Sequence, residues 1–139
     1  MELRMTMQMQ DVEGIEEMMC VPHGKLTRGC SCADPKVGAI SVERYSSTRS
    51  VEALPVLQLL LAAGLSIPAK IIADWLFQLL LKAKKRNRSI TIIVSGNVEL
   101  KVDYTDEPPT ITIAGARQEL SSAPIEKALA SAMPEEQAS

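Results

Sequence analysis

The sequence predicts an α+β fold with an N-terminal strand, a central apolar helix hairpin, a three-stranded antiparallel meander and a short C-terminal helix. Residues 2–10 alternate polar and apolar side chains, and residues 53–81 contain only two charged side chains. Residues 89–113 hold three strand-like stretches separated by turn residues. The chain has 139 residues, 46% of them hydrophobic, which is enough for one core. We therefore expect a single compact domain over residues 1–133.

The N-terminal segment is expected to form a strand with one buried face, because apolar residues recur at every second position. These residues are Leu3, Met5, Met7 and Met9. Asp11 can cap a short helix over residues 11–19. Residues 21–36 contain two prolines and two glycines without an apolar period, so we expect a loop there. A brief strand should follow over residues 37–45.

The apolar segment is predicted to form two helices, because the sequence GLSIP interrupts it. Gly64 can end the first helix, over residues 50–64, and Ser66 can cap the second, over residues 67–85. Pro68 falls in the first turn of the second helix, where its missing N–H costs nothing. Apolar residues cover most of the circumference of this second helix and leave one polar line, so we expect it to be enclosed on most sides. The polar line consists of Lys70, Asp74, Gln78 and Lys82.

The C-terminal part of the chain is predicted to be a meander followed by a helix. Gly96 and Asn97 separate SITIIVS from VELKVDY, which is a hairpin signal, and ITIAG supplies a third strand. Ser122 can cap a closing helix that carries Pro124 in its first turn. The acidic residues and small side chains of residues 134–139 indicate a disordered tail.

All three cysteines and the one histidine fall within residues 20–32, CVPHGKLTRGCSC. A structural zinc takes four such ligands, and the C-x2-H half has a common spacing, whereas the C-x-C half does not. The alternative, which the irregular spacing favours, is a loop that binds no metal. We therefore predict either no cofactor or one structural zinc. The zinc ligands would be Cys20, His23, Cys30 and Cys32.

Catalysis and disulfide formation are less favoured interpretations of this stretch. A nucleophilic Cys20 paired with His23 would need an orienting third group and an oxyanion site, and neither can be identified in the sequence. The odd number of cysteines argues against a disulfide framework, and the N-terminus does not have the apolar run of a signal peptide. We expect a cytoplasmic protein that is not an enzyme.

The charge pattern does not indicate a nucleic-acid-binding protein, because fifteen basic and seventeen acidic side chains give a net charge of -2. A basic run does end the second predicted helix, and we interpret it as a solvated helix end. It consists of Lys82, Lys84, Lys85, Arg86 and Arg88. A membrane hairpin over residues 51–82 is a further alternative, but each predicted helix falls short of the roughly 20 apolar residues that a span requires.

Residues 71–102 combine an apolar helix containing Asp74, Trp75 and Leu76, a basic cluster, and the hairpin ITIIVSGNVELKV. This order of features resembles the second half of the effector-associated constant component family, which is encoded in bacterial conflict and defence gene clusters. The resemblance covers about residues 50–104. It implies a non-catalytic adaptor or scaffold that accompanies a variable effector, such as a protease or a nucleotide-dependent switch. It brings no catalytic residues.

The two apolar helices predict a function in protein–protein contact. A domain of this size can rarely enclose both helices fully, so we expect a homo-oligomer or a tightly held protein partner. The predicted interface lies on residues 51–82, with Ile71, Trp75, Phe77 and Leu80 as its main contacts. Two alternatives stay open: a zinc-stabilised or thiol-sensing regulatory protein, and a membrane-associated component that uses the helix hairpin.

Overall fold

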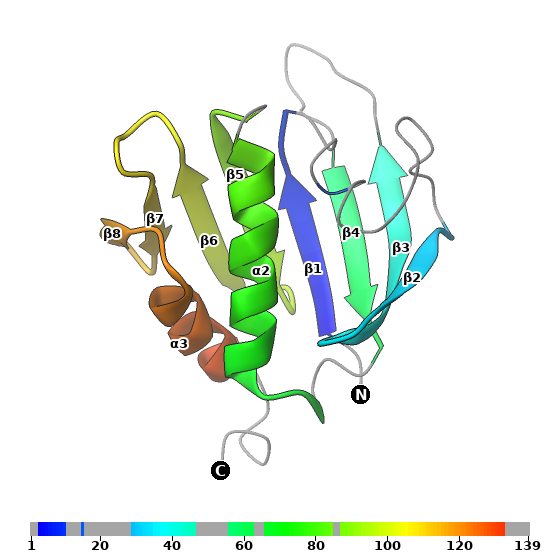
Figure 1. Ribbon diagram of the computed structural model, residues 1–139. Coiled ribbons are helices and arrows are strands. Elements are labelled where there is room, and N and C mark those ends of the chain that lie inside the picture. Colours follow the sequence, from blue (N-terminus) through cyan, green and yellow to red (C-terminus); the bar gives the residue numbers. More distant parts are fainter. Residues whose placement is uncertain are drawn as a thin grey trace.

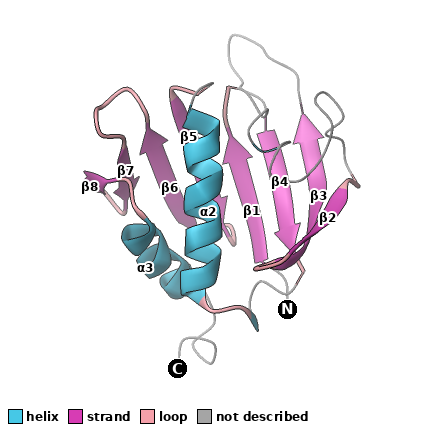
Figure 2. Ribbon diagram, in the orientation of Figure 1, coloured by secondary structure: helices cyan, strands magenta, loops and turns pink. Residues whose placement is uncertain are grey.

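The computed structural model describes residues 3–10, 15, 29–46, 56–62, 66–84 and 87–132. These residues form one antiparallel sheet with two helices on the same face (Figures 1 and 2). The strands are β1 (Leu3–Gln8), β2 (Ser31–Asp34), β3 (Gly38–Ser46), β4 (Val56–Leu61), β5 (Ser89–Val94), β6 (Val98–Asp103), β7 (Thr110–Ile113) and β8 (Ala116–Glu119). The helices are α2 (Ala69–Ala83) and α3 (Ser122–Ala132). The strand order is β2-β3-β4-β1-β5-β6-β7-β8.

The predicted N-terminal strand is confirmed as β1, and it lies in the middle of the sheet. Leu3, Met5 and Met7 are fully buried on the side of the helices, whereas Arg4 and Gln8 are exposed on the other side. β1 pairs with β4 along one edge and with β5 along the other. The N-terminal segment therefore joins the two halves of the sheet.

The predicted helix hairpin is wrong, because its first half contains a strand. Residues 56–61 form β4, which pairs with β3 and β1, while residues 50–55 and 63–64 of the predicted helix lie outside the described part of the chain. Leu57, Leu59 and Leu61 point into the core in strand alternation. Hydrogen bonding and packing against two neighbouring strands outweigh the helix propensity of leucine here.

The predicted three-stranded meander is also wrong as a separate unit. β5, β6 and β7 do pair in sequence, but β1 continues the sheet on one side and β8 on the other. The predicted loop over residues 21–36 includes a strand as well, since β2 pairs with β3. The predicted brief strand over residues 37–45 is confirmed as β3.

The second predicted helix and the closing helix are confirmed as α2 and α3. In Figure 1, α2 runs across the middle of the sheet, and α3 lies beside it, against α2 and β6. The core between sheet and α2 includes Ile72, Trp75, Leu76, Leu79 and Leu80. Of the helices that the structure describes, none has the length and apolar character of a membrane span.

Two further predictions concern residues that the structure does not describe. The short helix expected over residues 11–19 is represented only by Ile15, which is helical and fully buried. The tail expected to be disordered, residues 134–139, lies entirely outside the described residues.

Candidate binding surface

The sheet has a second face, opposite α2 and α3, which we call the open face. It follows from strand alternation: side chains at every second position of β1, β4, β5 and β6 point away from the buried core. The described residues of the open face on the six strands from β4 to β8 are Arg4, Thr6, Gln8, Val56, Gln58, Leu60, Ser89, Thr91, Ile93, Glu99, Lys101, Asp103, Thr110, Thr112, Arg117 and Glu119.

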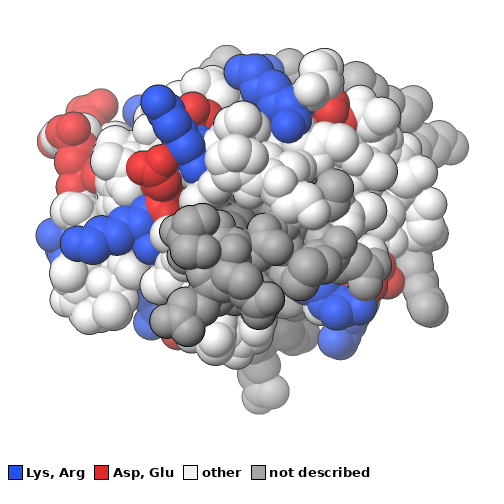
Figure 3. Space-filling model, turned by 90° about the horizontal axis from the view of Figure 1, so that it is seen from below, with Lys and Arg blue, Asp and Glu red and all other residues white. Residues whose placement is uncertain are grey.

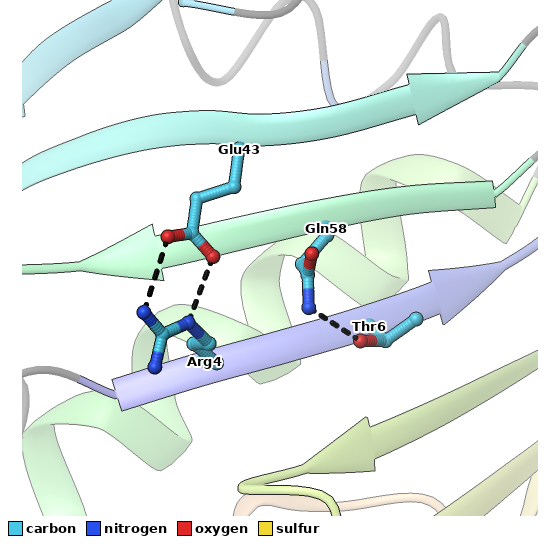
Figure 4. Close-up of polar contacts among 4 residues, drawn as sticks. All are labelled: Arg4, Thr6, Glu43 and Gln58. Atoms are coloured by element: carbon cyan, nitrogen blue, oxygen red, sulfur yellow. Dashed lines mark hydrogen bonds and ion pairs between the residues drawn. The ribbon is translucent and has the colours of Figure 1, made fainter.

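One group of polar side chains, the Arg4 cluster, spans β3, β4 and β1 on the open face (Figure 4). Arg4 Nε donates to Glu43 Oε2 at 2.9 Å, and its Nη2 donates to Glu43 Oε1 at 3.4 Å. Beside this ion pair, Gln58 Nε2 donates to Thr6 Oγ1 at 3.4 Å. A hollow of about 350 Å³ is lined by three residues of the cluster, Arg4, Thr6 and Gln58, and also by Ser95 and Gly96.

A β-bulge lets Glu43 reach Arg4 across the intervening strand. The pairing of β3 with β4 shifts between Val42, which faces the core, and Arg44. An extra residue in one strand of a pair redirects a side chain. Glu43 is that residue, and its carboxylate extends over β4 toward β1.

A second group, the Lys101 cluster, lies in register across four strands. Thr91 on β5 is opposite Lys101 on β6, which is opposite Thr112 on β7 and then Arg117 on β8. These side chains line a hollow of about 310 Å³, together with Ser89, Asp103 and Thr110 among others. The cluster therefore offers hydroxyl groups and two cations around one hollow of the open face.

Acidic side chains stand beside both cations of this cluster, and Lys101 Nζ lies 3.6 Å from Glu99 Oε1 on the same strand. Arg117 Nη2 forms an ion pair with Asp106 Oδ2, which also accepts from Thr110 Oγ1 at 3.2 Å. The hydroxyl and backbone N–H of Thr105 donate to Asp103 Oδ1 at 2.5 and 2.8 Å and hold the pKa of Asp103 below its usual value. Asp103 is thus ionised at neutral pH and suits hydrogen-bond acceptance better than proton transfer.

Ile93 lies between the two clusters and is 37% exposed. On the open face it is opposite Thr6 of the Arg4 cluster on one side and Glu99 on the other. An apolar side chain with polar neighbours on both sides can be covered by a partner while the surrounding groups form hydrogen bonds. This arrangement suits binding of the surface of another protein.

The four predicted zinc ligands are only partly described, so the zinc hypothesis stays a prediction. Cys20 and His23 lie outside the described residues. Cys30 and Cys32 are half-buried and pack against the core at the start of the chain's second strand. Within the described ranges, no three His, Cys, Asp or Glu side chains come together at metal-binding distance.

The predicted interface residues divide between the surface and the core. Ile71 is 37% exposed and Phe77 is half-buried, but Trp75 is 4% exposed and Leu80 is fully buried. Trp75 and Leu80 therefore pack inside the fold and present little area to a partner.

The predicted basic run is described at three positions. Lys82, Lys84 and Arg88 are exposed, while residues 85–86 lie outside the described chain. On the face seen in Figure 3, lysine and arginine side chains lie apart from one another, with acidic side chains among them.

The open face was missed by the interpretation of the sequence, although its signal was present. Thr91, Ile93, Lys101 and Thr112 all occupy alternate positions in stretches that were recognised as strands. Assembling the whole face also required β4, which pairs with β1 and which the sequence interpretation assigned to a helix, whereas β1 itself pairs directly with β5.

Comparisons with known protein families, with curated proteins and with solved structures find no match to this chain. The resemblance to the effector-associated constant component family stays a prediction from the sequence.

Proposed function

We propose that this chain is a non-catalytic protein-binding domain, an adaptor or scaffold whose open face receives another protein. The observation that carries the proposal is the position of Ile93, 37% exposed and flanked by polar side chains on the neighbouring strands. Protein interfaces commonly have an apolar centre within a polar, partly solvated rim. The open face has this distribution of side chains.

The backbone beneath Ile93 is held from both sides, which favours binding without a large loss of conformational entropy. β5 pairs with β1 along one edge and with β6 along the other. Side chains placed on central strands need less ordering on binding than side chains on loops. The surface that we propose is therefore formed before the partner arrives.

The charged groups of the open face supply selectivity. Arg4 and Glu43 sit on one side of Ile93, and Lys101 and Asp103 on the other. A partner must match both signs at both places, because unmatched charges at an interface lower affinity. We propose a variable effector of a bacterial conflict system as this partner, on the basis of the family resemblance.

A pair of matched substitutions tests which surface binds. Ile93 on the open face and Ile71 on the outer side of α2 are each 37% exposed. We expect Ile93→Arg to weaken binding at least about tenfold, equivalent to about 1.4 kcal/mol, and Ile71→Arg to leave it unchanged. The partner to use is an effector encoded beside this chain's gene, and titration calorimetry gives the affinity.

Both variants must first be shown to unfold at the wild-type temperature, since a folding defect would also reduce binding. If Ile71→Arg is the variant that loses affinity, the interface lies on α2, as the sequence predicted. If the wild-type chain binds no neighbouring effector, the adaptor proposal fails.

A further inference from the structure

Among the strands that the structure describes, β8 lies at one edge of the sheet, and all four of its residues are exposed. β7 and β8 form a hairpin in which Thr112 is opposite Arg117 and Thr110 is opposite Glu119. A strand at a sheet edge presents backbone N–H and C=O groups that a further strand can pair with.

The outward backbone groups of β8 belong to Arg117 and Glu119. Leu120 N donates to Pro109 O at 2.9 Å, so the N–H of Leu120 points toward β7. Because these groups alternate along an antiparallel strand, those of Ala116 and Gln118 also point toward β7. The N–H and C=O groups of Arg117 and Glu119 therefore point away from the sheet.

We propose that β8 pairs with β8 of a second copy of this chain, antiparallel and centred on Gln118, so that two sheets become one. In this register Arg117 of each copy is opposite Glu119 of the other. Both residues direct their backbone groups outward, and they exchange N–H···O bonds in both directions. Their side chains lie on the open face and form opposite-charge pairs across the edge.

The side chains of β8 select this register over its neighbours. Two neighbouring registers also pair outward backbone groups with outward backbone groups. One of them would place Arg117 opposite Arg117, and the other would place Glu119 opposite Glu119. Like charges directly opposite each other destabilise a sheet. In the proposed register Gln118 lies on the two-fold axis. Its side-chain amide has both donors and an acceptor, so it can form a hydrogen bond with the Gln118 side chain of the second copy.

Charges on an edge strand usually discourage pairing, but opposite charges that are self-complementary favour one partner. Arg117 already contacts Asp106 of its own chain, and a guanidinium has enough donors to bond a second carboxylate. A hollow of about 490 Å³ lies beside β8 on the helix side, between Ala116 and residues Ala123 and Lys127 of α3. Gln118 of the second copy would lie along its mouth.

Sedimentation of the purified full chain over a wide concentration range tests the proposal without any other partner. We expect wild-type protein to dimerise, and Glu119→Arg to weaken dimerisation on the order of tenfold, because each opposite-charge pair becomes a like-charge pair. Arg117→Glu should weaken it similarly. The doubly substituted chain, with both changes, should dimerise like wild type.

Mixing the two single variants gives the decisive outcome. One variant then carries two cations on β8 and the other two anions, so a heterodimer should form more tightly than either variant dimerises alone. A general folding defect cannot produce this rescue. A wild-type chain that stays monomeric at all concentrations, single variants that dimerise normally, or a mixture without heterodimer would each overturn the proposal. Ile93→Arg should dimerise normally, which separates this test from that of the proposed function.

Discussion

Asn87 is predicted to be a main polar support of the fold. It is buried, with 6% of its surface exposed, between the end of α2 and the end of β1. Its Oδ1 accepts from Gln10 N at 2.7 Å, and its Nδ2 donates to Ala83 O at 2.9 Å. One amide thus joins the last turn of the central helix to Gln10, two residues after the end of β1, although the two segments are far apart in sequence.

Replacing Asn87 with alanine removes both hydrogen bonds and leaves their backbone partners behind. A buried polar group that loses its partner costs about 1–3 kcal/mol. Ala83 is fully enclosed, whereas Gln10 is half-buried and can recover part of this energy from water. We therefore expect Asn87→Ala to lower the free energy of unfolding by about 2–4 kcal/mol.

Asn87→Asp separates the two bonds, because the carboxylate still accepts from Gln10 but cannot donate to Ala83. It also places a negative charge at the C-terminal end of α2, where the helix dipole disfavours it. The folded state should therefore raise the pKa of the introduced carboxyl. A group whose pKa is raised in the folded state stabilises the fold most below its unfolded pKa and loses that contribution as the pH rises. The free energy of unfolding of this variant should therefore be closest to that of wild type in acid and fall furthest below it at neutral pH.

Urea unfolding followed by the fluorescence of Trp75, the single tryptophan, measures these changes. Gln8→Ala serves as a control, because Gln8 is exposed on the same part of β1, and it should change stability by less than about 0.5 kcal/mol. An Asn87→Ala variant as stable as this control would refute the reasoning.

Two further predictions concern the hairpin of β7 and β8 and the end of β6. The turn residues Ala114 and Gly115 have φ of 51° and 82°, a conformation that favours Asn-Gly. In urea titrations, Ala114→Asn should raise the free energy of unfolding by about 0.5–1 kcal/mol, and Gly115→Ala should lower it by about 1 kcal/mol. If both substitutions changed the free energy of unfolding by the same amount and in the same direction, the predicted role of this turn would be wrong. Tyr104 Oη donates to Leu80 O at 2.6 Å, and burial raises its pKa well above the ordinary 10.0. As the pH rises, the tyrosine hydroxyl therefore loses its proton in the unfolded chain before it does in the folded one, so the free energy of unfolding should fall above about pH 10. Tyr104→Phe should lower the free energy of unfolding by about 1 kcal/mol at neutral pH and make its decline at alkaline pH less steep. An unchanged alkaline decline in this variant would exclude Tyr104 as its source.

The sequence predicted those elements whose pattern is complete within a short segment. β1 alternates strictly, so its buried and exposed faces could be assigned before its neighbours were known. α2 has helical spacing, a starting proline and a basic end, and its predicted limits differ from the observed Ala69–Ala83 by two residues. In both segments the local propensity agrees with the tertiary packing.

β4 could not be predicted in this way, because it is apolar on both faces. Leu57, Leu59 and Leu61 enter the core, but Val56 and Leu60 on the open face are also apolar and half-buried. A short leucine-rich run without alternation fits a strand or a helix equally well. The partners that decide the outcome, β1 and β3, are distant in sequence, and so the open face could not be assembled from local patterns.

The two proposed surfaces have different centres, Ile93 and Gln118, but they share Arg117 and Glu119 on the open face. Pairing of β8 around a two-fold axis through Gln118 keeps Arg117 and Glu119 of both copies on the same side of the joined sheet, which is the side of the open face. A dimer would therefore present Ile93 twice in one direction. A partner that is itself dimeric could then engage both copies, and its apparent affinity would exceed that of one open face because the second contact is intramolecular. Loss of the β8 contact should weaken binding of such a dimeric partner more than binding of a monomeric partner, because the edge and the open face belong to one sheet.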